Sequence, residues 1–462
     1  METKDALEIA QENYTEYSKY VAMGRAYPNI LDGCKSSYKR AIYGMWKDGP
    51  RSIVKCAKLA SYALPYHPHP TSISSVIVQL GNNGNKLKLM DTQGNWGDST
   101  KGIEPSADRY IGGKLSDLAI KLFCDSCEYV RTIKGEIDED EPIALPALIP
   151  LCFINGLSGI PSGLPTLNIP PINIIEMIEY YIEILKNKSL DYTPNWIPSP
   201  NFEINVISSK DEWKEVMTSG KGTIKLAPVM SKKDNTITIT ALPQPKTIEH
   251  IRKILDKELV ADKIDIRDES TSNTCIVVEK VPRKQCDMVE IYWKLYKGLQ
   301  SSESLNMAFF GEDKIFVPCS FERAVKANLG HLIDTHNNRI IKQLESNRKK
   351  LRVLEIIESI KNSNDVSELS KLDSQQALDF IETKYGVDRE ISNEVMKKPI
   401  SYLTKEHEKE IIDLQNLISS LETDKNDIYD FLLKKYRSLK REMTKLLDGK
   451  FRPTTFIQSK RI

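Results

Sequence analysis

An arginine followed directly by a tyrosine, Arg109-Tyr110, is the residue pair with the clearest chemical potential in this sequence. A tyrosine phenolate can attack a phosphodiester and conserve the energy of the broken bond as a phosphotyrosine ester. The neighbouring guanidinium can offset the charge that builds on the phosphoryl group during that attack. The chain has 19 tyrosines, so the dipeptide alone does not distinguish a nucleophile from an ordinary core or surface tyrosine.

A second group of reactive side chains is the His67-x-His69 pair in a proline-rich stretch. Such a pair could bind a metal ion or hydrogen-bond within its own loop. No third His or Cys stands nearby with a clear ligand pattern, so we expect no metal site in this chain. The one CxxC, Cys124 to Cys127, lacks the second pair of a zinc ribbon. We expect reduced core thiols there, with a redox pair as the alternative.

The overall composition limits the class of protein. With 462 residues, the chain is long enough for roughly three domains. A net charge of +1 excludes a uniformly basic protein, yet nine basic and only two acidic residues fall between Lys19 and Leu59. That basic block predicts a polyanionic partner, unless it is only a solvated charged face.

The sequence shows no sign of a membrane or secreted protein. No run of about 20 apolar residues is present, and the N-terminal METKDALEIAQENY lacks the apolar segment of a signal peptide. We therefore expect no membrane partner and a cytoplasmic location.

Two helices should position the reactive residues. Residues 35–47 (KSSYKRAIYGMWK) predict a helix with Lys35 and Lys39 on one face, and Thr71 or Ser72 can cap a second helix after the proline-rich loop. Together they suggest a helix-turn-helix-like DNA reader. The acidic run at 136–141 (EIDEDE) is expected to be a solvated loop.

The rest of the chain divides by pattern. A short amphipathic helix is predicted over 173–188 and alternating strands over 202–320. From 325 onward apolar residues recur at helical spacing in two long stretches, separated by shorter helical pieces at about 363–402. This predicts an antiparallel arm with a small head, or alternatively a helical bundle. The basic tail should be flexible.

Seven ordered segments resemble one known family. They are RAYPNILDGCKSSYKRAIYGM (25–45), YHPHPTSIS (66–74), MDTQGNWGD (90–98), ADRYIGGKL (107–115), INGLSGIPSGLPTLNIPP (154–171), IDIRDES (264–270) and YLTKEHEKEI (402–411). They are similar to segments of the breakage-reunion subunit of type IIA DNA topoisomerases, the family formed by the A subunits of DNA gyrase and topoisomerase IV. Within it, the chain most resembles the medium subunits of T4-like bacteriophage DNA topoisomerases, with a truncated bacterial A subunit as the alternative.

The resemblance implies an α+β multidomain fold. It predicts an N-terminal arm (1–28), a winged-helix breakage-reunion domain (29–164), an α/β tower domain (165–324), a long antiparallel coiled coil (325–447) with a helical dimer gate at about 363–402, and a basic tail (448–462).

The resemblance also assigns roles to residues. Tyr110 would form a 5′-phosphotyrosyl link to DNA, and Arg109 would stabilise the transition state. Ile160 would insert between base pairs and bend the duplex. The other DNA contacts would be Lys35, His67, His69, Arg25, Lys39, Arg40, Ser72 and Lys114.

Partners and cofactors follow from the same resemblance. We expect Mg²⁺ and ATP on a separate ATPase/Toprim subunit that resembles the B subunit of gyrase, and a homodimer within an A2B2-type assembly on double-stranded DNA. Because no DNA-wrapping domain follows the last helical stretch, we expect relaxation and decatenation without gyrase-type supercoiling. The alternative is a catalytically inactive DNA-binding scaffold of the same fold. A coiled-coil structural protein would explain only the last third of the sequence.

Overall fold

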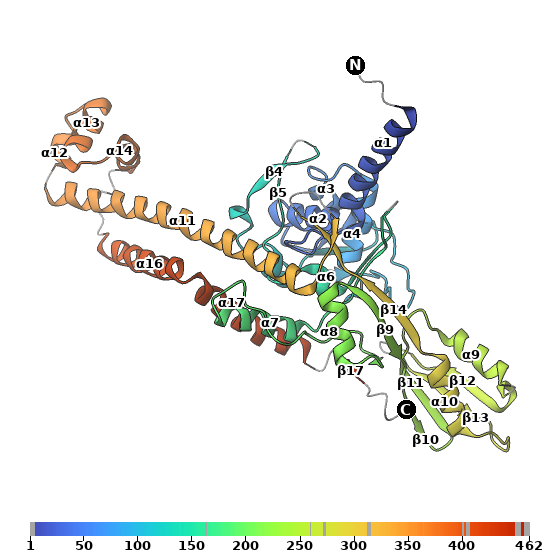
Figure 1. Cartoon of the computed structure of the whole chain (residues 1–462). Coiled ribbons are helices and arrows are strands. Elements are labelled where there is room, and N and C mark those ends of the chain that lie inside the picture. Colours follow the sequence, from blue (N-terminus) through green and yellow to red (C-terminus); the bar gives the residue numbers. More distant parts are fainter. Residues whose placement is uncertain are drawn as a thin grey trace. The chain divides into compact units, whose positions relative to one another are not determined.

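The computed structural model describes residues 5–137, 139–161, 164–258, 260–270, 274–311, 316–363, 365–399, 402, 407–448 and 454–456 (Figure 1). The chain forms two compact units, one made of Met1–Leu332 with Lys435–Ile462 and the other of Ile333–Lys434. Among the described residues, no helix is both long and apolar enough to span a membrane.

Three helices of the first unit pack on one another beside a small antiparallel sheet. The helices are α2 (Ser36–Lys47), α3 (Cys56–Ala63) and α4 (Pro70–Leu80). The sheet has the order β1 (Val54–Lys55), β3 (Gly112–Leu115), β2 (Met90–Gln93). The α-helix α1 (Ala6–Val21) and the π-helical η1 (Ala22–Ala26) precede them.

Both predicted helices around the reactive residues are confirmed, but the expected cap of the second one is wrong. His69 is the N-cap of α4, without a side-chain capping bond, and Pro70 follows it as a first-turn residue. Proline lacks an N–H and has its φ already set for a helix, so it suits a helix start. The cap therefore lies two or three residues earlier than Thr71 or Ser72.

The next segment contains a hairpin that the sequence did not predict. Its elements are α5 (Asp117–Phe123), η2 (Cys127–Tyr129), β4 (Thr132–Lys134), β5 (Asp140–Pro142) and α6 (Leu151–Asn155). Strands β4 and β5 pair antiparallel. The acidic run at 136–141 is therefore not simply a solvated loop, because it runs into β5 and Glu141 is only 3% exposed.

The cysteines of the CxxC are buried free thiols. Burial raises the pKa of Cys124 well above its usual range and that of Cys127 to about 12. A thiol that resists deprotonation is a poor redox nucleophile. The structure therefore favours reduced core thiols at this position.

A six-stranded sheet follows. Its order is β17 (Thr455–Phe456), β8 (Asn205–Val206), β9 (Lys221–Ala227), β14 (Ser301–Asn306), β7 (Leu167–Ile169) and β6 (Leu157–Gly159). Helices α7 (Ile174–Lys186) and α8 (Lys210–Ser219) belong to the same region, and α7 confirms the amphipathic helix predicted there. Strand β17 pairs parallel to β8, so this part of the tail is a strand rather than a free end.

A second sheet of four strands lies between β9 and β14 in the chain. Its order is β10 (Val229–Lys233), β11 (Thr236–Ala241), β13 (Ile276–Lys280) and β12 (Ile264–Asp268). Its apolar face packs on α9 (Ile248–Lys257) and α10 (Met288–Gly298), with η3 (Ala261–Lys263) before β12. Strands β15 (Ala308–Phe310) and β16 (Phe316–Pro318) form a separate pair. The predicted strands, and with them the α+β class, are confirmed.

The second unit is helical. Helix α11 (Phe321–Asn362) begins in the first unit and continues into the second. The later helices are α12 (Val366–Leu369), α13 (Ser374–Tyr385), α14 (Arg389–Met396), α16 (Glu408–Asn426) and α17 (Ile428–Leu447), of which α17 belongs to the second unit only as far as Lys434. The second long stretch is two helices, because Asp427 leaves helical geometry (φ −138°) and its carboxylate accepts from the Asp430 N–H. The coiled coil and dimer gate stay predictions.

Candidate functional site

Tyr110 lies on a short turn directly before the central strand of the small sheet. Its N–H donates to the carbonyl of Ala107 at 2.8 Å. The next residue, Ile111, is fully buried and its carbonyl accepts from the N–H of Cys56 at 3.0 Å. The phenol itself is 64% exposed. The backbone of Tyr110 is thus anchored while its side chain points to solvent.

Two cations lie next to this tyrosine. The Cζ atom of Arg109 is 4.6 Å from the centroid of the Tyr110 ring, within the range of a cation–π contact. The Nζ atom of Lys55, at the end of β1, donates to the Tyr110 carbonyl at 3.4 Å. The sequence places Lys55 in the basic block but assigns it no role. Only the pairing of β1 with β3 brings it to the tyrosine.

His67, His69 and Ser72 form one cluster at the start of α4. The Nε2 atom of His67 lies 3.0 Å from the Ser72 hydroxyl, which also donates to the His69 carbonyl at 3.0 Å. His69 and Ser72 are more exposed, whereas His67 is 6% exposed. Burial, with the charges of Arg40 and His69, lowers the pKa of His67 to about 4. The imidazole is therefore neutral near pH 7. Its buried Nδ1 has no hydrogen-bond partner among the described residues.

Arg25, Lys35 and Ile160 are brought together although they are far apart in sequence. Lys35, the N-cap of α2, donates from Nζ to the Ser158 carbonyl of β6 at 3.0 Å. At Gly159 a Cβ would lie 2.7 Å from the Ala26 carbonyl oxygen, so only glycine allows this backbone approach. These contacts hold Ile160, which is 88% exposed, next to the segment that carries the exposed Arg25.

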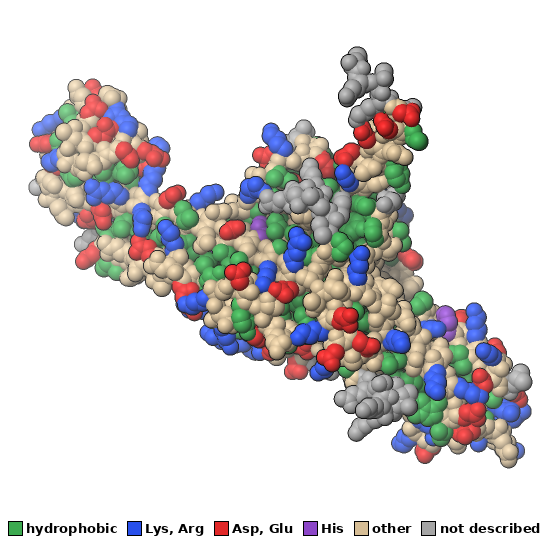
Figure 2. Space-filling view, viewed as in Figure 1, with side chains coloured by type: hydrophobic (Ala, Val, Ile, Leu, Met, Phe, Trp, Pro, Cys, Tyr) green, Lys and Arg blue, Asp and Glu red, His purple; other side chains and the backbone are tan. Residues whose placement is uncertain are grey.

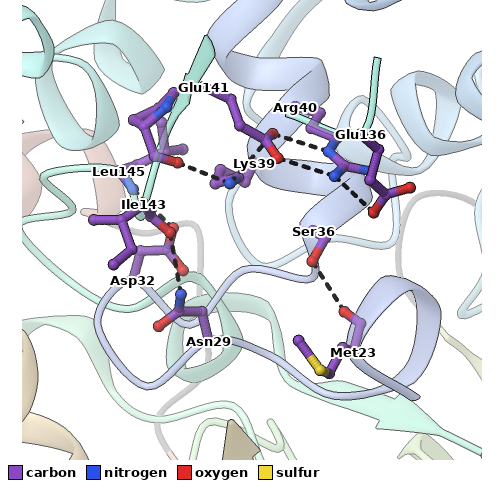
Figure 3. A network of polar contacts seen from close by, with 11 residues as sticks. Met23, Asn29, Asp32, Ser36, Lys39, Arg40, Glu136, Glu141, Ile143 and Leu145 are labelled. Carbon is purple, nitrogen blue, oxygen red and sulfur yellow. Dashed lines mark hydrogen bonds and ion pairs between the residues drawn. The ribbon is translucent and has the colours of Figure 1, made fainter. Parts of the chain in front are cut away.

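Lys39 and Arg40 lie in a buried ion-pair network (Figure 3). Arg40 donates from Nε and Nη2 to the two oxygens of Glu141 at 2.9 Å each, and from Nη2 to Glu136 at 2.9 Å. Lys39 Nζ lies 3.3 Å from Glu141 and donates to the Pro142 carbonyl at 2.8 Å. Both cations are at most 6% exposed. This favours a structural role for them, and their expected contact with DNA stays a prediction.

The pKa shifts of Lys39, Arg40 and Glu136 follow from the balance between burial and the ion pairs of the network. Burial lowers the pKa of Lys39, partly offset by Glu141 and Asp32. Burial alone would also lower the pKa of Arg40, but hydrogen bonds and charges of Glu141 and Glu136 raise it overall. For Glu136, burial acts to raise the pKa, and the contact with Arg40 outweighs this and lowers it.

Asp32 anchors the loop before α2. Its two carboxylate oxygens accept from the N–H groups of Cys34 and Leu145, at 2.8 Å each. Burial raises the pKa of Asp32 to about 6, although these two hydrogen bonds oppose the rise. The loop that leads into Lys35 is therefore tied to the segment that follows β5.

The expected DNA contact Lys114 lies on β3 opposite Asp91 of β2, with 3.4 Å between Nζ and the carboxylate.

Among the described residues, no hydrogen bond or ion pair joins Tyr110 or Arg109 to the histidine cluster. The described part of the chain also holds no group of three or more His, Cys, Asp or Glu side chains suited to a metal ion.

Residues 25–445 match the family model of the A subunit of DNA gyrase/topoisomerase IV. The chain belongs to this family. The resemblance drawn from the seven segments is therefore confirmed at family level, and the bacteriophage link stays a prediction.

Curated members of the family align over most of the chain. The topoisomerase 4 A subunit of Salmonella typhimurium is 26% identical over 89% of this chain and 59% of its own length. The DNA gyrase A subunit of Chlamydia pneumoniae is 30% identical over 76% and 44%. That of Buchnera aphidicola is 29% identical over 94% and 55%. The chain spans about half the length of these relatives.

Proposed function

We propose that this chain is the DNA-cleaving subunit of a type IIA topoisomerase, with Tyr110 as nucleophile. The observation that carries the proposal is an exposed phenol on an anchored turn, with the Arg109 guanidinium 4.6 Å from its ring. An exposed side chain can reach the backbone of a bound duplex. A rigid turn limits the entropy lost when the phenol is aligned with a phosphorus atom.

The proposed reaction is a reversible transesterification. The Tyr110 oxygen attacks a backbone phosphorus and becomes esterified to the 5′ phosphate, while the 3′ oxygen leaves. The phenol loses its proton and the leaving oxygen gains one, so the reverse attack restores the strand and its energy is conserved. Arg109 donates charge-assisted hydrogen bonds to the phosphoryl oxygens. Lys55 holds the carbonyl of Tyr110 and keeps the turn in place.

DNA binding is proposed to involve the exposed side chains on the same part of the molecule. Arg25, His69 and Ser72 would contact phosphates, and Lys35 and Lys114 would do so after exchanging their present partners. The Ile160 side chain is exposed, so it could enter a base step without a change in the surrounding fold. Lys39 and His67 would act mainly by holding α2 and the histidine cluster in shape.

The protein is proposed to act as a homodimer with an ATPase/Toprim partner that holds Mg²⁺ and ATP. Residues 29–164 would form the winged-helix domain, 165–324 the tower, and 325–447 the coiled coil and dimer gate. We propose relaxation and decatenation in a cytoplasm rather than negative supercoiling. ATP-dependent negative supercoiling by the reconstituted enzyme would contradict this part alone.

Covalent trapping tests the nucleophile. The chain is mixed with its matched ATPase/Toprim partner, Mg²⁺ and end-labelled duplex, then denatured with detergent. We expect a protein–DNA adduct from the wild type and none from Tyr110→Phe. An adduct that survives in Tyr110→Phe would mean another nucleophile. DNA binding without any adduct, in the presence of an active partner, would support the inactive scaffold instead.

A further inference from the structure

The two carboxylates that bind Arg40 differ in depth and geometry. Glu141, with a side chain 4% exposed, takes both Nε and Nη2 in a two-pronged contact. Glu136 has a side chain 34% exposed and takes one bond from Nη2. Figure 3 shows the two carboxylates approaching the guanidinium from different sides. The single, part-exposed contact can open without releasing Arg40, because Glu141 fixes the guanidinium plane.

The surroundings of Glu136 suit a phosphate. The Tyr20 hydroxyl donates to its carboxylate at 3.1 Å. The charges of Arg25 and Arg40 both act on Tyr20 and His67, which places these cations in one electrostatic neighbourhood. Arginine guanidinium groups are donors that typically bind phosphodiester oxygens, whereas the Tyr20 hydroxyl holds the Glu136 carboxylate in place.

The acidic hairpin formed by β4 and β5, which carries Glu136, lies along helix α2 and pairs with its basic side chains. Five of the seven residues from 135 to 141 are acidic. Besides the Arg40 contacts, Glu139 lies 3.7 Å from Lys47 at the end of α2. On the side of the molecule in view in Figure 2, acidic and basic side chains are interspersed, so charge alone marks no binding face there. The specific pairing on α2 therefore carries the argument.

We propose that Glu136 occupies the place of a DNA phosphate on Arg40 and competes with DNA for it. On binding, a backbone phosphate would displace Glu136, while Glu141 keeps the guanidinium in position. Glu136 then limits the affinity for duplex DNA, and Glu141 is a positioning residue. The inference rests on the proposed function, because its ligand is the phosphodiester of a bound duplex.

The test compares Glu136→Gln with Glu139→Gln in the full-length chain. Both variants remove one negative charge from the same hairpin, but Glu139 pairs with Lys47 rather than Arg40. Binding of a fluorescently labelled duplex is measured by anisotropy over a salt series. We expect Glu136→Gln to bind about fivefold more tightly than Glu139→Gln, as for one part-exposed ion pair removed. Its log–log salt dependence should be steeper by up to about 0.9.

The outcomes separate this inference from the proposed function. If the wild type binds duplex and both variants bind equally, or Glu136→Gln binds more weakly, the competition is refuted and the function stands. If no form binds duplex, both fail. Circular dichroism checks that the variants fold. Should Glu136→Gln misfold, Tyr20→Phe removes the hydroxyl that holds Glu136 without changing charge. It should raise affinity about twofold, and an unchanged affinity would then refute the competition.

Discussion

Replacing Glu141 by glutamine should destabilise the part of the fold that carries the site. The Glu141 carboxylate is the common partner of two buried cations, with bonds of 2.9 Å to Nε and Nη2 of Arg40 and 3.3 Å to Nζ of Lys39. Glutamine has nearly the same shape but no charge. Glu141→Gln therefore leaves both cations in a low-dielectric site with one partner fewer.

The expected loss of unfolding free energy depends on the partners that Lys39 and Arg40 keep in Glu141→Gln. Removing one partner of a buried ion pair costs about 3–5 kcal/mol. Lys39 keeps the Pro142 carbonyl and Arg40 keeps Glu136, so we expect the lower limit of about 3 kcal/mol. The matched control is Glu139→Gln, because the Glu139 side chain is 54% exposed and its Lys47 partner lies 3.7 Å away. That exposed pair should contribute less than about 0.5 kcal/mol.

Urea unfolding followed by tryptophan fluorescence measures this difference, with Trp46 of α2 as a reporter. Hydrogen–deuterium exchange then locates it. A loss of about 3 kcal/mol corresponds to roughly 150-fold less protection of the α2 amides if they exchange by opening of this region. The same small loss of unfolding free energy in both glutamine variants would refute the stabilising role of the buried ion-pair network. A large loss confined to Glu141→Gln would support it.

Three further substitutions test other parts of the site. Burial and the charges of Arg40 and His69 lower the pKa of His67 to about 4. The neutral imidazole therefore stabilises the fold above about pH 6.5, and this stabilisation is lost as the pH falls toward 4. In urea titrations at pH 7.5 and pH 5, the unfolding free energy of the wild type should fall by about 2 kcal/mol more than that of His67→Gln. Ile160→Ala should change the unfolding free energy by no more than about 0.5 kcal/mol, since the side chain is 88% exposed. It should reduce the bending of a bound duplex, measured by energy transfer between the duplex ends, and unchanged bending would contradict the insertion of Ile160 between base pairs. Lys55→Met should lower adduct formation per bound duplex roughly fivefold. The control Lys58→Met, also at an exposed position, should leave adduct formation unchanged, and equal losses in both variants would mean that only the net charge affects cleavage.

Local patterns predicted the elements around the site well. The run from Lys35 to Lys47 gave the bounds of α2 to within one residue, because helical spacing of apolar residues is a property of neighbours in sequence. The alternating TITITA of β11 buries Ile237 and Ile239 and packs them on two helices. The segment ADRYIGGKL singled out Tyr110 through the family resemblance, but the turn that displays its side chain was not predicted.

What the sequence could not predict depends on contacts between distant residues. The charge count places Lys39 and Arg40 on an open basic face, but Arg40 pairs with a carboxylate 101 positions away. The acidic run at 136–141 is assigned to solvent for the same reason. Lys55 reaches Tyr110 only through strand pairing. None of these contacts has a local signature, since side-chain partners across a fold are set by tertiary packing.

Burial divides the expected DNA-binding residues into two groups with different experimental behaviour. Arg25, His69 and Ser72 are at least partly exposed, so their substitution should alter DNA affinity while the unfolding free energy stays nearly constant. Lys39, Arg40 and His67 are buried, so their substitution should lower stability and DNA affinity together. A loss of DNA binding at a buried position is therefore no sign of phosphate contact unless stability is measured beside it. The competing carboxylate of Glu136 gives the cleaner test of Arg40, because its removal should strengthen binding, an effect that a destabilised fold would not produce.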